Sequence, residues 1–196
     1  MILGPRNFKD TRLSALFFLW VISVLWVPLP GFCEEKEFDL QVYLTKKQAL
    51  EITFPGVDEI VKEKKWLTDE QRKEIGELSQ QEVRDRRLTF FVGKKNGKST
   101  GYMLIDHRLG KSFPITYMVV LNIDGTVRDV EIMVYREPHG WEVRYESFLS
   151  QFFGKDTESD FREVNSITGA TLSVNSIKGG VQKAVAAYKV LYGSVK

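Results

Sequence analysis

The chain has almost no cysteine and very little histidine. Cys33 is the only cysteine, and the histidines are His107 and His139. Residues 34–196 therefore cannot form an internal disulfide, use a thiolate nucleophile or bind zinc or an iron–sulfur cluster through cysteine. The two histidines stand far apart in the sequence, one in a strand-like stretch and one in a loop-like stretch, which argues against a metal site.

Strong charge and the common nucleotide-binding motifs are missing too. The formal net charge is +2, so electrostatics give no case for a nucleic-acid partner. Hydrophobic residues make up 43% and charged residues 28% of the chain, as in globular proteins. No Rossmann fingerprint or Walker motif is present, and no acid–base or nucleophile–base pair stands out.

The first 33 residues differ in kind from the rest. Three basic side chains at positions 6, 9 and 12 precede the uncharged apolar run 13–27, and "PLPGFC" and the acidic "EEKEFD" follow. This order predicts a secretory signal peptide over 1–33, cleaved after Cys33. The run is shorter than the roughly 20 residues of a membrane-spanning helix, although an uncleaved N-terminal anchor is the alternative. We therefore expect an exported protein, periplasmic or on the outer face of the cytoplasmic membrane.

Residues 34–87 predict a helical N-terminal segment. Thr45 is a hydroxyl helix start, and Pro55 with Gly56 ends that helix. Apolar positions between 57 and 67 continue the helical interpretation, and Thr68 begins a further helix. We expect surface helices here.

Residues 88–135 predict four strands. Two runs of β-branched and aromatic residues enclose the "NG" turn at Asn96–Gly97, and two more enclose the "DG" turn at Asp124–Gly125. Such turns between apolar runs are strong hairpin signals, and successive hairpins make an antiparallel sheet.

A loop and two helical stretches follow the strands. A Pro/Gly loop and a short helix are expected between 137 and 153, and a final helix after Ser173. Gly179 and Gly180 inside that helix indicate either the close approach of another backbone or a late helix start. The predicted fold class is α+β, an antiparallel sheet of hairpins with the C-terminal helix packed on it, plus N-terminal helices.

The segment "SITGATLS" at 166–173 combines small and hydroxyl residues before the last helix. One interpretation is structural: Gly169 permits a turn, and Ser173 caps the helix by accepting a backbone N–H bond. The other is functional. A helix start offers unpaired N–H groups to a phosphate, and Gly169 and Ala170 leave the Thr171 hydroxyl open.

This segment resembles the flavinylation motif of FMN-binding domains, a Ser/Thr-Gly-Ala-Ser/Thr core followed by another Thr or Ser. Such domains occur in Na⁺-translocating NADH:quinone reductases, in Rnf-type complexes and in related extracytoplasmic proteins. The resemblance extends over about 92–192: "GKSFPITYMVVLNIDGTVRDVEIMVYREPHGWEV" is similar to the family's sheet and Glu-Pro-x-Gly loop, and "FLSQFFGK" to the next helix. Many members carry Asp where this chain has Asn165.

The resemblance implies a covalent FMN. In the family, a separate Mg²⁺-dependent flavin transferase takes FMN from FAD and esterifies its phosphate to the second hydroxyl residue of the core, here Thr171. The resemblance implies that this loop lies near the flavin. The alternative role for Trp141 is that of a core or rim aromatic side chain, and the alternative role for Glu137 is a hydrogen bond within the loop. The predicted cofactor-binding residues are Thr168, Gly169, Ala170, Thr171, Leu172, Ser173, Glu137, Gly140 and Trp141, with Pro138 and His139 as further loop candidates.

We accordingly expect an FMN-binding domain over 88–196 that carries electrons between membrane or extracytoplasmic redox partners, after maturation by a flavin transferase. Two alternatives remain at this point. One is a module that binds FMN non-covalently as a sensor or carrier, and the other is a flavin-free adaptor domain.

Overall fold

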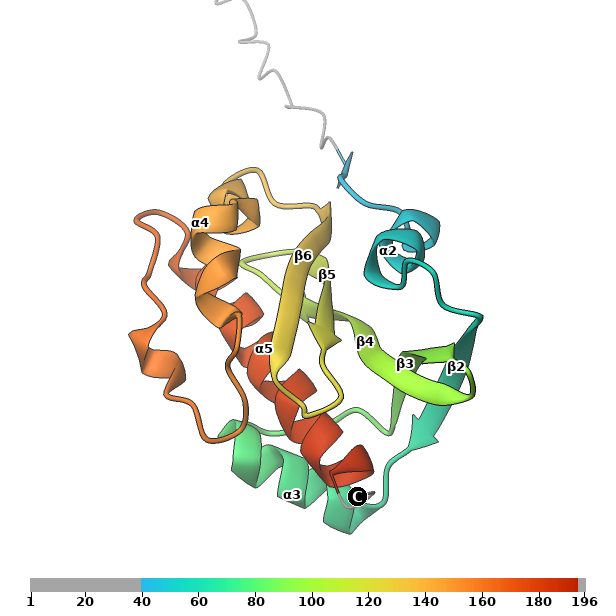
Figure 1. Cartoon of the computed structure of the whole chain (residues 1–196). Helices are drawn as coiled ribbons and strands as arrows, with labels where there is room; N and C mark the ends of the chain where they lie inside the picture. The colour runs from blue at the N-terminus through green and yellow to red at the C-terminus, as the bar shows by residue number, and fades with distance from the viewer. Residues whose placement is uncertain (1–39, 194–196) are drawn as a thin grey trace, which may run out of the picture. The chain divides into compact units, whose positions relative to one another are not determined.

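The computed structural model describes residues 40–193, so the predicted signal peptide or anchor at 1–33 lies outside them. Six strands form one antiparallel sheet in the order β1-β6-β5-β4-β3-β2 (Figure 1). The α+β class, the sheet of hairpins and the C-terminal helix are confirmed. The elements are β1 (Gln41–Val42), α2 (Lys46–Thr53), β2 (Glu59–Trp66), α3 (Asp69–Ser79), β3 (Arg87–Lys95), β4 (Lys98–Leu109), β5 (Pro114–Leu121), β6 (Val127–Tyr135), η1 (Trp141–Arg144), α4 (Glu146–Leu149), η2 (Ser150–Phe152), η3 (Phe161–Glu163) and α5 (Thr171–Tyr192).

The two N-terminal helices begin where the sequence predicts. Thr45 and Thr68 each accept a hydrogen bond from the backbone N–H three residues later, and the side chains of Gln48 and Gln71 accept one from the backbone N–H of Thr45 and Thr68. These capping boxes satisfy N–H groups that a helix start leaves unpaired.

The helical prediction for 57–67 is wrong, because residues 59–66 form the strand β2. Its partner is β3, with Glu59 opposite Lys94 and Trp66 opposite Arg87. Exposed and partly covered side chains alternate along β2, as expected for an edge strand. Lysine and glutamate favour helices intrinsically, but pairing with a buried neighbouring strand outweighs that weak preference.

The sheet separates two apolar clusters. On one face the helices α3, α4 and α5 cover side chains from β3 to β6, and this is the larger cluster. On the other face α2 places Ala49 and Phe54 against Phe91, Met103 and Met118. Figure 1 shows α5 running diagonally across the sheet, so its N-terminus comes to the end of the sheet where β6 finishes.

Helix α5 is regular from Thr171 and starts two residues before Ser173, so the late-start interpretation of the glycine pair is wrong. A Cβ built at Gly180 would lie 2.3 Å from the Tyr117 hydroxyl oxygen. The close approach is therefore made by a side chain of β5, not by another backbone. Because no larger residue fits over Tyr117, Gly180 lets α5 sit close to the sheet.

A buried ion pair holds the middle of α5 to β4. The Lys183 Nζ lies 2.7 Å from Asp106 Oδ2 and 2.8 Å from Asp85 Oδ2. The Lys183 and Asp106 side chains are 6% and 10% exposed. Asp106 also accepts hydrogen bonds from the Tyr117 hydroxyl and the His107 N–H. Since the partners are desolvated, losing one leaves the other unpaired at a high cost.

Lys183→Met should therefore destabilise the fold by about 3 kcal/mol, because it leaves the Asp106 carboxylate buried without its cation. The matched control is Lys73→Met, which removes a solvent-exposed partner of Glu77 and should change stability by less than about 0.5 kcal/mol. Urea unfolding of both variants measures the difference. Equal losses in the two would contradict a structural role for the buried pair.

The predicted boundary between 34–87 and 88–196 stays a prediction, although β2 and β3 on its two sides pair in one sheet. The described residues, 40–193, all fall within one compact unit. Among residues 40–193, none of the helices has the length and apolarity needed to cross a bilayer.

Candidate functional site

Three segments that are distant in sequence meet at the N-terminus of α5 and enclose a pocket of about 420 Å³. They are the turn between β4 and β5, the loop after β6, and the first residues of α5 with those just before them. The lining residues are Lys111, Ser112, Phe113, Glu137, Pro138, His139, Gly169, Ala170, Thr171, Leu172 and Ser173. The structure thus brings most of the predicted site residues into one concavity of ordinary ligand-pocket size.

The start of α5 presents free backbone donors to this pocket. Ala170 is the N-cap and makes no side-chain capping bond, so the N–H groups of Thr171, Leu172 and Ser173 lack capping partners. Gly169 adopts a φ of +83°, and a Cβ there would meet nothing within 4 Å. Uncapped N–H groups and the positive end of the helix dipole together favour an anion.

Ser173 does not cap the helix as the structural interpretation expected. It is the third helical residue, is only 4% exposed, and its Oγ lies 2.9 Å from the Tyr135 hydroxyl oxygen. That hydroxyl donates to the backbone carbonyl of His139 at 2.7 Å. Because a tyrosine has one hydroxyl proton, Ser173 must be the donor in the other bond.

Tyr135 keeps its proton over a wide pH range. Burial raises the pKa of Tyr135 to about 12, against a smaller lowering by the Ser173 hydrogen bond. The phenol is therefore a permanent donor to the loop carbonyl at neutral pH. A Cβ at Gly140, where φ is +84°, would lie 2.9 Å from the Tyr135 oxygen and 3.0 Å from Ser173 Oγ. Glycine at this position leaves room for the tyrosine–serine pair.

Glu137 joins two walls of the pocket. Its Oε1 accepts hydrogen bonds from the N–H groups of Ser112 and Phe113, at 2.6 and 2.9 Å. The turn is also tied to α5, since the Ser176 hydroxyl donates to the carbonyl of Leu109. Of the two roles expected for Glu137, the structure shows the hydrogen bond that organises the loops.

Other predicted residues lie at or beyond the rim. Trp141 is outside the pocket lining, is 38% exposed and packs edge to face against Tyr145. Thr168 is exposed, just before the lining begins. Asn165 is also exposed, and its backbone N–H donates to Gln151. These three residues, like the predicted residue Gly140, are therefore absent from the pocket lining.

Sequence reasoning missed the 111–113 turn and Tyr135. The turn could have been found, because in an antiparallel sheet the β4–β5 connection lies at the end of the sheet where β6 finishes. Tyr135 carries no such signal. Its ring is buried in the core like that of an ordinary sheet-packing residue, but its hydroxyl reaches the pocket-forming loop and helix.

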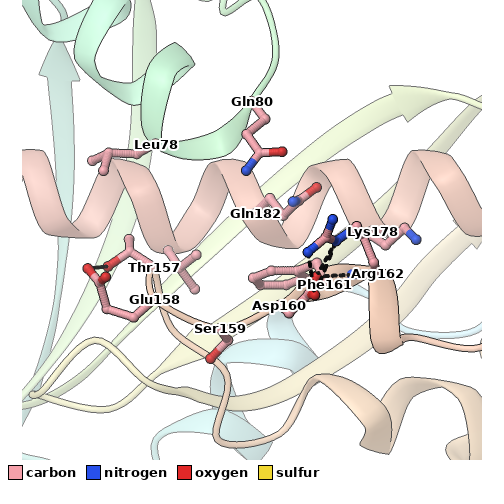
Figure 2. A pocket seen from close by; sticks show the side chains of 11 residues that line it. Leu78, Gln80, Thr157, Glu158, Ser159, Asp160, Phe161, Arg162, Lys178 and Gln182 are labelled. Carbon is pink, nitrogen blue, oxygen red and sulfur yellow. Dashed lines mark hydrogen bonds and ion pairs between the residues drawn. The ribbon is translucent and has the colours of Figure 1, made fainter.

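A second hollow of about 390 Å³ lies on the outer side of α5, between the end of α3 and the loop 157–162 (Figure 2). Arg162 and Asp160 there are already paired with each other. It contains none of the predicted site residues. Within residues 40–193, histidine, cysteine, aspartate and glutamate form no group suited to a metal ion.

Replacing Gly140 with alanine should destabilise the protein through two effects, the positive φ and the collision with the Tyr135 and Ser173 oxygens. We expect a loss of about 2–3 kcal/mol. Gly154→Ala is the matched control, because Gly154 also has a positive φ but open space around its Cβ; it should cost about 1 kcal/mol. Urea unfolding measures both. Equal losses would show that Gly140 is needed only for its backbone angle.

The sequence comparisons agree with this geometry. Residues 110–186 match the family described as FMN-binding domain, a range that contains all three walls of the pocket. A search of curated proteins finds no match. The chain therefore contains an FMN-binding domain over residues 110–186, and this match supports an FMN-binding protein.

Proposed function

We propose that this protein is an exported electron carrier in which FMN is joined through its phosphate to the Thr171 hydroxyl. The observation that carries the proposal is the position of Thr171. It is the first residue of α5, it is exposed, and it lines the pocket that the family match contains.

The residues present fit a phosphate at this point. The uncapped N–H groups of the first helical turn supply donors, and the helix dipole favours negative charge there. Gly169 and Ala170 add no bulk beside the Thr171 hydroxyl. Lys111, on the facing turn, adds a cationic side chain to the lining.

Attachment requires an incoming nucleotide and an enzyme that acts on it. The Thr171 oxygen would form a new bond to the FMN phosphorus of FAD, the bond between that phosphorus and the AMP half would break, and AMP would leave while the threonine proton is lost. The resemblance to the flavinylated family implies a separate flavin transferase as the catalyst.

The rest of the pocket fits a flat, largely apolar ring. Pro138, Ala170 and Leu172 provide apolar surface, and the Glu137 bonds hold the facing turn in place. Bound FMN supplies the redox chemistry, accepting one or two electrons, while the protein positions it.

The N-terminal sequence supports export. Basic residues and the apolar run 13–27 precede a change to acidic sequence, which is the order of a secretory signal. A covalent bond suits that location, because a dissociated flavin outside the cytoplasm would be lost by diffusion. The partners would be the flavin transferase and redox proteins of the membrane or the space outside it.

The test is to export the chain together with a flavin transferase and measure its intact mass and its in-gel flavin fluorescence after denaturation. The wild type should gain one FMN less one water, and Thr171→Ala should gain nothing. Ser166→Ala is the matched control, since this nearby exposed hydroxyl is outside the pocket lining and is not a predicted site residue, and it should load like the wild type.

Two other results would contradict the covalent carrier. An unmodified mass with a yellow native protein would indicate the non-covalent FMN module. An unmodified mass with a colourless protein that does not take up added FMN would indicate the flavin-free adaptor.

A further inference from the structure

We propose that Tyr135 is a positioning residue for the flavin: its hydroxyl sets the distance between the loop wall of the pocket and the start of α5 that bears Thr171. The inference rests on the FMN site proposed above and deepens it. Tyr135 does not line the pocket, so it acts through the groups that do.

The hydroxyl oxygen of Tyr135 links three segments of the chain. Tyr135 ends β6, donates to the carbonyl of His139 in the loop, and accepts from Ser173 in the first turn of α5. The strand, the loop and the helix are thereby held at hydrogen-bond distances of 2.7 and 2.9 Å from a single buried atom. Both partner residues line the pocket.

The loop packs closely against the helix start at this place. A Cβ at Gly140 would lie 3.4 Å from Cβ of Ala170, as well as against the two hydroxyls. The Glu137 bonds tie the same loop to the β4–β5 turn and not to α5. Removing the Tyr135 hydroxyl therefore breaks the direct hydrogen-bonded link between the loop and α5, and the loop stays connected to α5 only indirectly, through Glu137, the turn and Ser176.

A shift of the loop should change the position of a bound group more than it changes the stability of the fold. Positioning groups must hold their geometry closely, and a misplacement of about 1 Å can cost up to about 100-fold in a reaction rate. The aromatic ring of Tyr135 fills the core, and phenylalanine preserves that ring. The variant Tyr135→Phe should therefore fold but lose the spacing.

Tyr117 provides a matched control. It lies on the neighbouring strand β5, is fully buried under α5, and its hydroxyl donates to Asp106. Tyr117→Phe removes the same atom from the same core, beside Gly180 instead of beside the pocket. A purely structural role for Tyr135 would make the two variants alike.

The experiment uses full-length wild type, Tyr135→Phe and Tyr117→Phe, each exported with a flavin transferase. The rate of FMN attachment, the visible circular dichroism of the loaded protein and the melting temperature are compared. Tyr135→Phe should attach FMN about tenfold more slowly and show an altered flavin dichroism. Tyr117→Phe should match the wild type in both, although its melting temperature falls. Ser173→Ala breaks the same link from the helix side and should reproduce the effect of Tyr135→Phe.

Two results would overturn the inference: wild-type attachment and dichroism in Tyr135→Phe, or equal changes in Tyr117→Phe. If the wild type is not modified, the covalent proposal fails, and titration with free FMN then tests the inference separately. Tyr135→Phe should raise the dissociation constant about tenfold relative to the wild type and to Tyr117→Phe. An unchanged constant, or no binding of FMN by the wild type, would overturn it.

Discussion

The packing of α5 against the sheet determines where the pocket lies. Tyr117 allows the helix to approach only because position 180 is glycine, and the ion pair of Lys183 with Asp106 anchors the next turn. At its N-terminus the helix meets the Tyr135 hydroxyl. With these points held, the first turn of α5 necessarily stands beside the loop that leaves β6.

The pocket has two chemically different parts, and both follow from that arrangement. One part is the open helix start with its free N–H groups and the Thr171 hydroxyl, which suits an anion. The other is formed by the two loops, which Glu137 ties together and which bring apolar side chains. A phosphate-bearing molecule with a flat apolar ring matches both parts, in keeping with the FMN-binding domain match.

Much of this could be predicted from the sequence because local signals agreed with the fold. The "NG" and "DG" turns indicated the hairpins, and small and hydroxyl residues marked the entrance of α5. The strand β2 could not be predicted, since its lysines and glutamates favour a helix and only pairing with β3 makes them a strand. Tyr135 was missed for a related reason: its role comes from partners 4 and 38 positions away in the chain, which no local pattern reveals.

The most direct test of covalent attachment at Thr171 is to locate FMN within the sequence. Trypsin should release residues 163–178, a peptide that contains Thr168, Thr171 and Ser173, and fragmentation of that peptide by mass spectrometry assigns the modification to one residue. We expect FMN on Thr171 alone. FMN on Thr168 or Ser173, or an unmodified peptide from protein matured with a flavin transferase, would contradict it.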